Sequence, residues 1–146
     1  MTKKLFILLL LSSSLFSSSV FTLDNIKNLK FHFTNNTYFM EKDEKQEIEK
    51  FIKNKLQKAG FVFGEVDPIT FVVKVKSIEI DEVHVITVFI GLAEDVTTKR
   101  IDKIETYAFT YMADTLIESE DPYEDTLEAI DFLTCQFLTA YGDDNE

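Results

Sequence analysis

The chain has 146 residues, of which 15 are Lys or Arg and 26 are Asp or Glu, so its net charge at pH 7 is −11. The charge is concentrated at the carboxyl end, because residues 104–146 hold twelve acidic side chains and no Lys, Arg or His. Such a field repels phosphates and anionic lipid surfaces and argues against nucleic-acid binding, which leaves a solvated acidic surface or a docking surface for a basic partner.

Residues 1–19 have the layout of a secretory signal peptide. Two lysines near the amino end precede an apolar run from Leu5 to Leu11, and small residues suitable for cleavage follow. The apolar run is shorter than the roughly 20 residues of a bilayer span, and no cysteine near the cleavage site is available for acylation. We therefore expect cleavage after Ser19, a periplasmic or secreted mature chain, and no stable membrane anchor.

One domain is expected after the signal peptide. Roughly 125 residues can bury one hydrophobic core but not two of ordinary size, so we assign residues 20–142 to a single domain and 143–146 to an acidic tail. The only cysteine, Cys135, excludes an intramolecular disulfide, so packing must supply the stability. Because Cys135 falls inside a predicted helix, we expect its thiol to be buried.

The domain begins with a strand and a helix. Residues 29–34 alternate between apolar and polar side chains, which is the period of a strand with one buried face. From 43 to 59 apolar residues recur at helical spacing, while lysines and glutamates fill the opposite face. Asp43 is a suitable N-cap with Gln46 at the capping-box position, and Gly60 ends the helix.

Three strands are predicted next. Residues 69–76 alternate between apolar and polar side chains, and residues 101–113 carry aromatic side chains at alternate positions. The run 83–92 between them has β-branched or aromatic residues on both faces. This pattern predicts a central strand covered on both sides, or a sheet edge that a partner buries.

The last helix has the clearest boundaries. Asp121 fits the N-cap and Pro122 the first helical position, and the apolar periodicity continues to Tyr141, where Gly142 ends the helix. Phe132 falls on the side opposite to the apolar face, so it is predicted to be exposed and is a candidate contact residue.

The predicted order of elements is therefore β-α-β-β-β-α. This order suits an α+β fold in which two helices pack on one face of an antiparallel meander sheet. Several unrelated kinds of exported protein share such an arrangement, so the architecture does not select a function.

The residues that catalysis would need are sparse. Two histidines and one cysteine cannot supply a zinc site of the usual kind, and neither GxSxG nor a glycine-rich phosphate loop is present. We therefore expect no enzymatic activity, no metal and no cofactor. The acidic residues between 118 and 125 offer oxygen ligands for calcium, but their spacing matches no EF-hand loop, and stabilisation of the helix N-terminus explains them.

The function favoured by the sequence is binding of another protein. We expect an exported, non-enzymatic protein of a bacterial envelope that acts as an accessory or assembly factor. The expected partner contacts are Phe132, Glu118, Glu120 and Asp125.

Two alternatives stay open. One is an acidic inhibitor or immunity protein that neutralises a basic enzyme, with the acidic final segment steering the encounter. The other is a small hydrolase or ligand-binding domain. Its pocket would lie between helices and sheet and would be lined by Tyr107, Phe109 and Tyr111, which alternate onto one face of the predicted strand.

Overall fold

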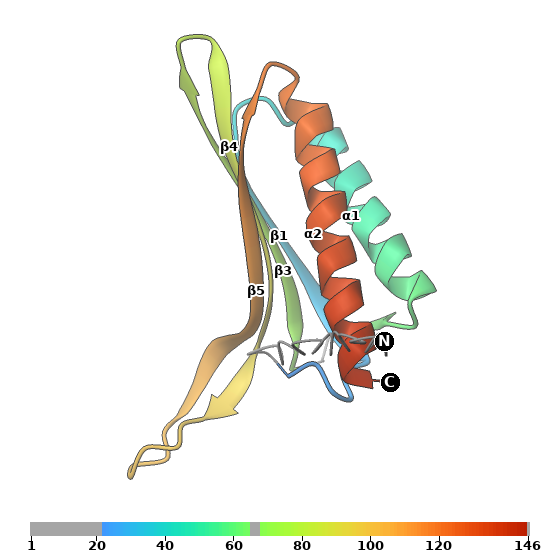
Figure 1. Cartoon of the computed structure of the whole chain (residues 1–146), viewed down its shortest axis with the longest axis vertical. Helices are drawn as coiled ribbons and strands as arrows, with labels where there is room; N and C mark the ends of the chain where they lie inside the picture. Colours follow the sequence, from blue (N-terminus) through green and yellow to red (C-terminus); the bar gives the residue numbers. More distant parts are fainter. Residues whose placement is uncertain (1–21, 65–67, 146) are drawn as a thin grey trace, which may run out of the picture.

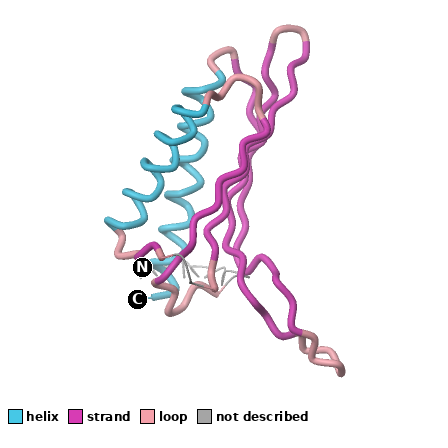
Figure 2. The backbone as a smooth tube through the Cα atoms, turned by 180° about the vertical axis from the view of Figure 1, so that it is seen from behind, coloured by secondary structure: helices cyan, strands magenta, loops and turns pink. Residues whose placement is uncertain are grey.

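The computed structural model describes residues 22–64 and 68–145, so the predicted signal peptide and its cleavage site lie outside the described residues. The described chain forms one mixed sheet of five strands with two helices against one of its faces (Figures 1 and 2). The predicted α+β class and the position of both helices on one face are confirmed.

The elements follow the predicted order, with one short strand added. In chain order they are β1 (Asn28–Asn36), α1 (Lys42–Lys58), β2 (Val62–Phe63), β3 (Thr70–Ile80), β4 (Val83–Thr97), β5 (Glu105–Ser119) and α2 (Pro122–Asn145). The order of strands across the sheet is β2-β1-β3-β4-β5.

The sheet is mixed, so the predicted antiparallel meander holds only for β3, β4 and β5. β1 pairs in parallel with both β2 and β3, because α1 carries the chain back to the starting end of β1 before β3 begins. β4 lies between β3 and β5, as predicted for a central strand, and the alternative of a buried edge is excluded for it.

Both helices differ from prediction at one end. α1 begins two residues earlier than expected, since Glu41 and not Asp43 is its N-cap, and the Glu41 N–H donates to Glu44 Oε2 over 2.7 Å. Its end beside Gly60 is confirmed, with φ of 99° at this glycine. α2 continues past Gly142, which is helical and does not end it.

Contacts with the amino-terminal segment explain the longer α2. The Leu23 N–H donates to Asp144 Oδ2 over 2.7 Å, and the Asn145 side chain donates to the Leu23 carbonyl over 3.0 Å. These two bonds hold the last turn of the helix against residues that precede β1.

The core lies between the sheet and the helices, with Phe137 of α2 at its centre. The Phe137 ring is fully buried and contacts the rings of Phe71, Tyr111 and Phe61 at centroid distances of 5.2, 5.3 and 5.7 Å. Buried side chains of β1, β3 and β4 complete this layer, and α1 adds Ile48, Ile52 and Leu56.

A β-bulge in β5 changes which way its aromatic side chains point. Leu92 pairs with Tyr111 and Ala93 with Phe109, so Thr110 is an extra residue without a partner in the ladder. Tyr111 therefore faces the core, whereas Phe109 contacts Phe89 on the opposite, open face of the sheet. The prediction that the aromatic residues of this strand share one face is wrong.

Candidate functional site

A groove between the last strand and the last helix contains most of the predicted contact residues. We call it the β5–α2 groove. Its volume, about 390 Å³, is at the lower end of the range of about 300–1,000 Å³ for ligand sites, and it is open to solvent. It is lined by Thr115, Ile117 and Glu118 from β5 and by Asp125, Glu128, Ala129 and Phe132 from α2.

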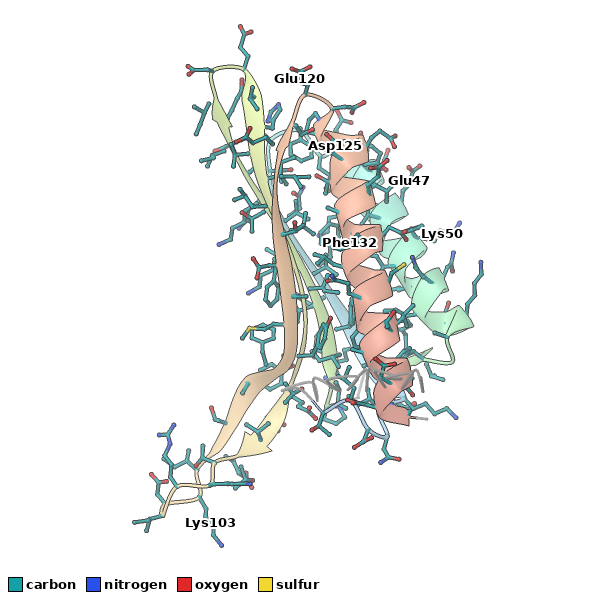
Figure 3. The ribbon with its side chains drawn as sticks, in the orientation of Figure 1. Glu47, Lys50, Lys103, Glu120, Asp125 and Phe132 are labelled. Atoms are coloured by element: carbon teal, nitrogen blue, oxygen red, sulfur yellow. The ribbon has the colours of Figure 1, made fainter. Side chains whose placement is uncertain are left out.

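The helical wall of the groove follows from the periodicity of α2. The inner face packs on β4 and β5 through residues such as Ile130, Leu133 and Phe137. Phe132 points away from that layer and is 56% exposed, which confirms the prediction that it does not belong to the buried face. Figure 3 shows it near the middle of α2, with Asp125 nearer the start of the helix.

The other wall is an edge strand with an open side. β5 is the last strand of the sheet and pairs with β4 alone among the described residues. Natural edge strands are often protected by Lys, Pro, bulges or short length. β5 has 15 residues without Lys, Arg or Pro, and its one bulge lies before Tyr111, so Asp114 and Glu118 are the charged residues along the following edge.

The lining of the groove is negative and apolar. Asp125 and Glu128 contribute carboxylates from α2, and no Lys, Arg or His lines the groove. Glu118 lines it at the end of β5, where its side chain alternates onto the open face of the sheet with Leu116. The Ser119 hydroxyl donates to Asp125 Oδ2 over 2.5 Å, which ties the end of β5 to the first turn of α2. Neither of the two ion pairs found in the described part of the chain involves a carboxylate of the groove.

Three of the four predicted contact residues come together in this groove. Glu118, Asp125 and Phe132 line it, but Glu120 is exposed in the turn before α2 and is not part of the lining. Glu128 was missed, although it lies one helical turn before Phe132. Ile117 was missed because the predicted strand ended at residue 113, whereas β5 continues to Ser119.

The three aromatic residues proposed for a pocket between helices and sheet do not line one pocket. Tyr111 is 5% exposed and packs in the core, whereas Tyr107 and Phe109 lie on the open face beside a hollow of about 230 Å³, below the usual size of a ligand site. Lys74 Nζ lies 5.6 Å from the ring centroids of both Phe89 and Phe109. This cluster covers the open face around the bulge.

Other chemistry is limited in the described residues. No group of three or more His, Cys, Asp or Glu side chains there is arranged to hold a metal ion. Nor does any described helix have the length and apolar character needed to cross a membrane.

Cys135 is exposed, contrary to the expected buried thiol, because its position on α2 faces α1. Lys55 Nζ of α1 lies 2.9 Å from the Cys135 sulfur and forms an ion pair with Asp131. Burial lowers the pKa of Lys55, but the bonds to Asp131 and Cys135 outweigh this effect and leave the pKa above its ordinary value of 10.5.

Comparisons with known proteins add little. No protein-family model and no curated protein sequence matches the chain. Among solved structures, a minor lipoprotein from Acinetobacter baumannii is similar at 15% identity and a TM-score of 0.34, over 79% of this chain and 91% of that chain. A likeness of this size carries no argument about function or location.

Proposed function

We propose that this chain is an exported, non-enzymatic protein of a bacterial envelope that binds a partner protein through the β5–α2 groove. The observation that carries the proposal is Phe132, a large aromatic side chain that is 56% exposed beside a strand edge. The signal-peptide pattern of residues 1–19 supports the exported location.

Phe132 is suited to a central role in an interface. Aromatic side chains bury a large area at low entropic cost and are enriched at the centres of interfaces. Here Ala129 and Ile117 supply an apolar floor, and the carboxylates of Asp125 and Glu128 supply a polar rim, which is the usual arrangement of a binding surface.

A second candidate is the inhibition of a basic enzyme. It is favoured by the uniformly negative charge of the groove and of residues 104–146. Electrostatic steering would make the association rate of such a complex fall steeply with added salt. An association rate that is independent of salt would contradict this candidate.

Site-specific crosslinking in cells tests the binding function. A photoreactive phenylalanine analogue would replace Phe132 in the full-length chain, expressed with its own signal in a diderm bacterium. The matched control is the same analogue at Phe51, another exposed helical phenylalanine, which lies on α1 outside the groove. We expect a specific adduct from position 132 alone. Equal adducts at both positions, or none at either, would refute a role of the groove in binding.

Removal of the Phe132 ring should weaken partner binding more than it lowers the stability of the fold. Phe132→Ala is expected to weaken binding of the crosslinked partner by at least about tenfold, as for an aromatic at the centre of an interface. The free energy of unfolding should change by less than about 1 kcal/mol, because the ring is already half-exposed. Isothermal titration calorimetry and urea unfolding measure the two effects separately.

A further inference from the structure

We infer that the partner contributes an extended, basic segment that pairs with β5 as a sixth strand of the sheet. This inference rests on the proposed function of the β5–α2 groove and specifies how the groove is occupied. An extended segment that adds to a sheet edge gains affinity from main-chain hydrogen bonds and specificity from alternate side chains.

The backbone of β5 offers a suitable template. From Tyr111 to Ser119 the strand keeps a continuous antiparallel register with β4, beyond the bulge at Thr110. At about 3.3 Å per residue, this stretch is about 30 Å long. In an antiparallel ladder, alternate residues of an edge strand direct their N–H and C=O groups away from the neighbouring strand, so this stretch can pair with another segment.

The side chains beside this edge are apolar on both faces of the sheet. On the helix side, Ile117 lies in the groove with Phe132. On the open side, Leu116 and Met112 are 65% and 53% exposed. The side chains of an added strand would therefore meet apolar surface on both faces of the sheet. A ligand confined to the groove would contact the helix side alone and would leave Leu116 and Met112 uncovered.

The negative charge beside β5 favours a basic segment as the added strand. Asp125 and Glu128 of α2 line the groove with carboxylates, and β5 adds Asp114 and Glu118 on its open face. Pairing of β5 with β5 of a second copy would bring these like charges together, within segments that each carry −12. A foreign strand with Lys or Arg at alternate positions meets the same carboxylates with opposite charge.

Crosslinking from two neighbouring positions of β5 tests the geometry. The photoreactive analogue would be placed at Thr115, which faces the groove, or at Leu116, which faces the open side. We expect both to react with one basic segment of the partner, at sites no more than about two residues apart, because side chains of a strand alternate between faces.

Other crosslinking results would overturn different parts of the inference. An adduct at Thr115 without one at Leu116, or a helical spacing of attachment sites, would overturn strand addition while the groove remains a binding site. An acidic segment would overturn the charge argument, and an adduct to a second copy would replace the partner with self-association. The absence of adducts at Thr115, Leu116 and Phe132 would overturn the proposed function itself.

A synthetic peptide that spans the crosslinked segment then supplies the quantitative test. The same peptide with alternate backbone nitrogens methylated keeps its charge but cannot form the ladder, so we expect its affinity to fall at least tenfold. Unchanged affinity would overturn strand pairing. Glu128→Lys should weaken binding of the unmethylated peptide at least tenfold, whereas Glu105→Lys, which changes the net charge equally outside the groove, should change it less than threefold. Equal effects of the two variants would mean that net charge, and not the charge of the groove, determines binding of the peptide.

Discussion

The two edges of the sheet are built differently. At one edge β2 has only two residues, and the neighbouring helix α1 contributes lysines that cover aromatic rings, with Lys53 Nζ 5.0 Å from the Phe31 centroid and Lys45 Nζ 5.6 Å from that of Phe33. At the other edge β5 has 15 residues, and α2 contains no lysine. In the described structure no lysine covers Phe132.

The difference shows how one architecture can close one edge and leave the other available. A lysine stem lies along apolar surface while its ammonium group stays in water, so it shields a ring from other contacts. No basic residue follows Lys103, so neither β5 nor α2 has a lysine or arginine that could cover the β5–α2 groove in this way. The long edge that has no basic side chain of its own is also the acidic one.

The largest expected effect comes from removing the side chain that holds α2 on the sheet. Phe137→Ala deletes a fully buried ring that contacts both β3 and β5, and we expect a loss of about 3–5 kcal/mol in the free energy of unfolding. Urea unfolding measures it, with Phe51→Ala on the other helix as the control, expected below about 1 kcal/mol. Similar losses in both variants would contradict the central position of Phe137.

The next effect concerns the bulge that orients β5. A Cβ at Gly91 would lie 2.8 Å from the Tyr111 carbonyl oxygen and 3.0 Å from the rings of Phe109 and Phe89. Because the backbone contact cannot relax cheaply, we expect Gly91→Ala to destabilise the protein by about 1–3 kcal/mol. Thermal unfolding measures the change. An unchanged melting temperature would mean that the aromatic cluster on the open face is loosely packed.

The sequence predicts local structure well because the signals for it are local. Pro122 at a helix start and Gly60 with positive φ at a helix end act through their own backbone. Asp43 with Gln46 and Glu41 with Glu44 share the same spacing, so the sequence did not distinguish the two caps. The parallel pairing of β1 depends on contacts between distant residues, which no local pattern encodes.

The candidate site was predicted in part for the same reason. The exposure of Phe132 follows from the period of its own helix, but the neighbours that make it a groove come from β5. The predicted strand ended at Ala113, whereas β5 continues to Ser119, and the exposed Leu116 breaks the alternation of apolar and polar residues in that continuation. The bulge at Thr110 belongs to the pairing of β5 with β4, so the directions of Tyr111 and Phe109 could not be predicted from spacing alone.

A smaller effect of opposite sign is expected at the end of α2. Gly142 is helical, and a Cβ there would meet no atom within 4 Å. Gly142→Ala should therefore stabilise the protein by about 0.5–1 kcal/mol, since glycine has the higher conformational entropy in the unfolded chain. Thermal unfolding should show a higher melting temperature. A lower one would mean that α2 ends before this residue in solution.

The smallest expected effect concerns the ion pair that joins the two halves of the helix layer, Lys55 of α1 and Asp131 of α2. Both groups are partly exposed, so Asp131→Asn should cost no more than about 1 kcal/mol at neutral pH. The pKa of Lys55 is raised in the folded state, since the bonds to Asp131 and Cys135 outweigh the opposing effect of burial, so its contribution to stability is complete below the ordinary value of 10.5. That contribution is lost as the pH rises through the folded pKa.

Burial also raises the pKa of Tyr111, so this residue adds to the alkaline loss of stability in wild type and variant alike. The difference between the two proteins therefore isolates the ion pair. Urea unfolding between about pH 8 and 12 should give two curves that converge at the alkaline end. Curves that stay parallel would mean that Asp131 stabilises the fold without the Lys55 charge.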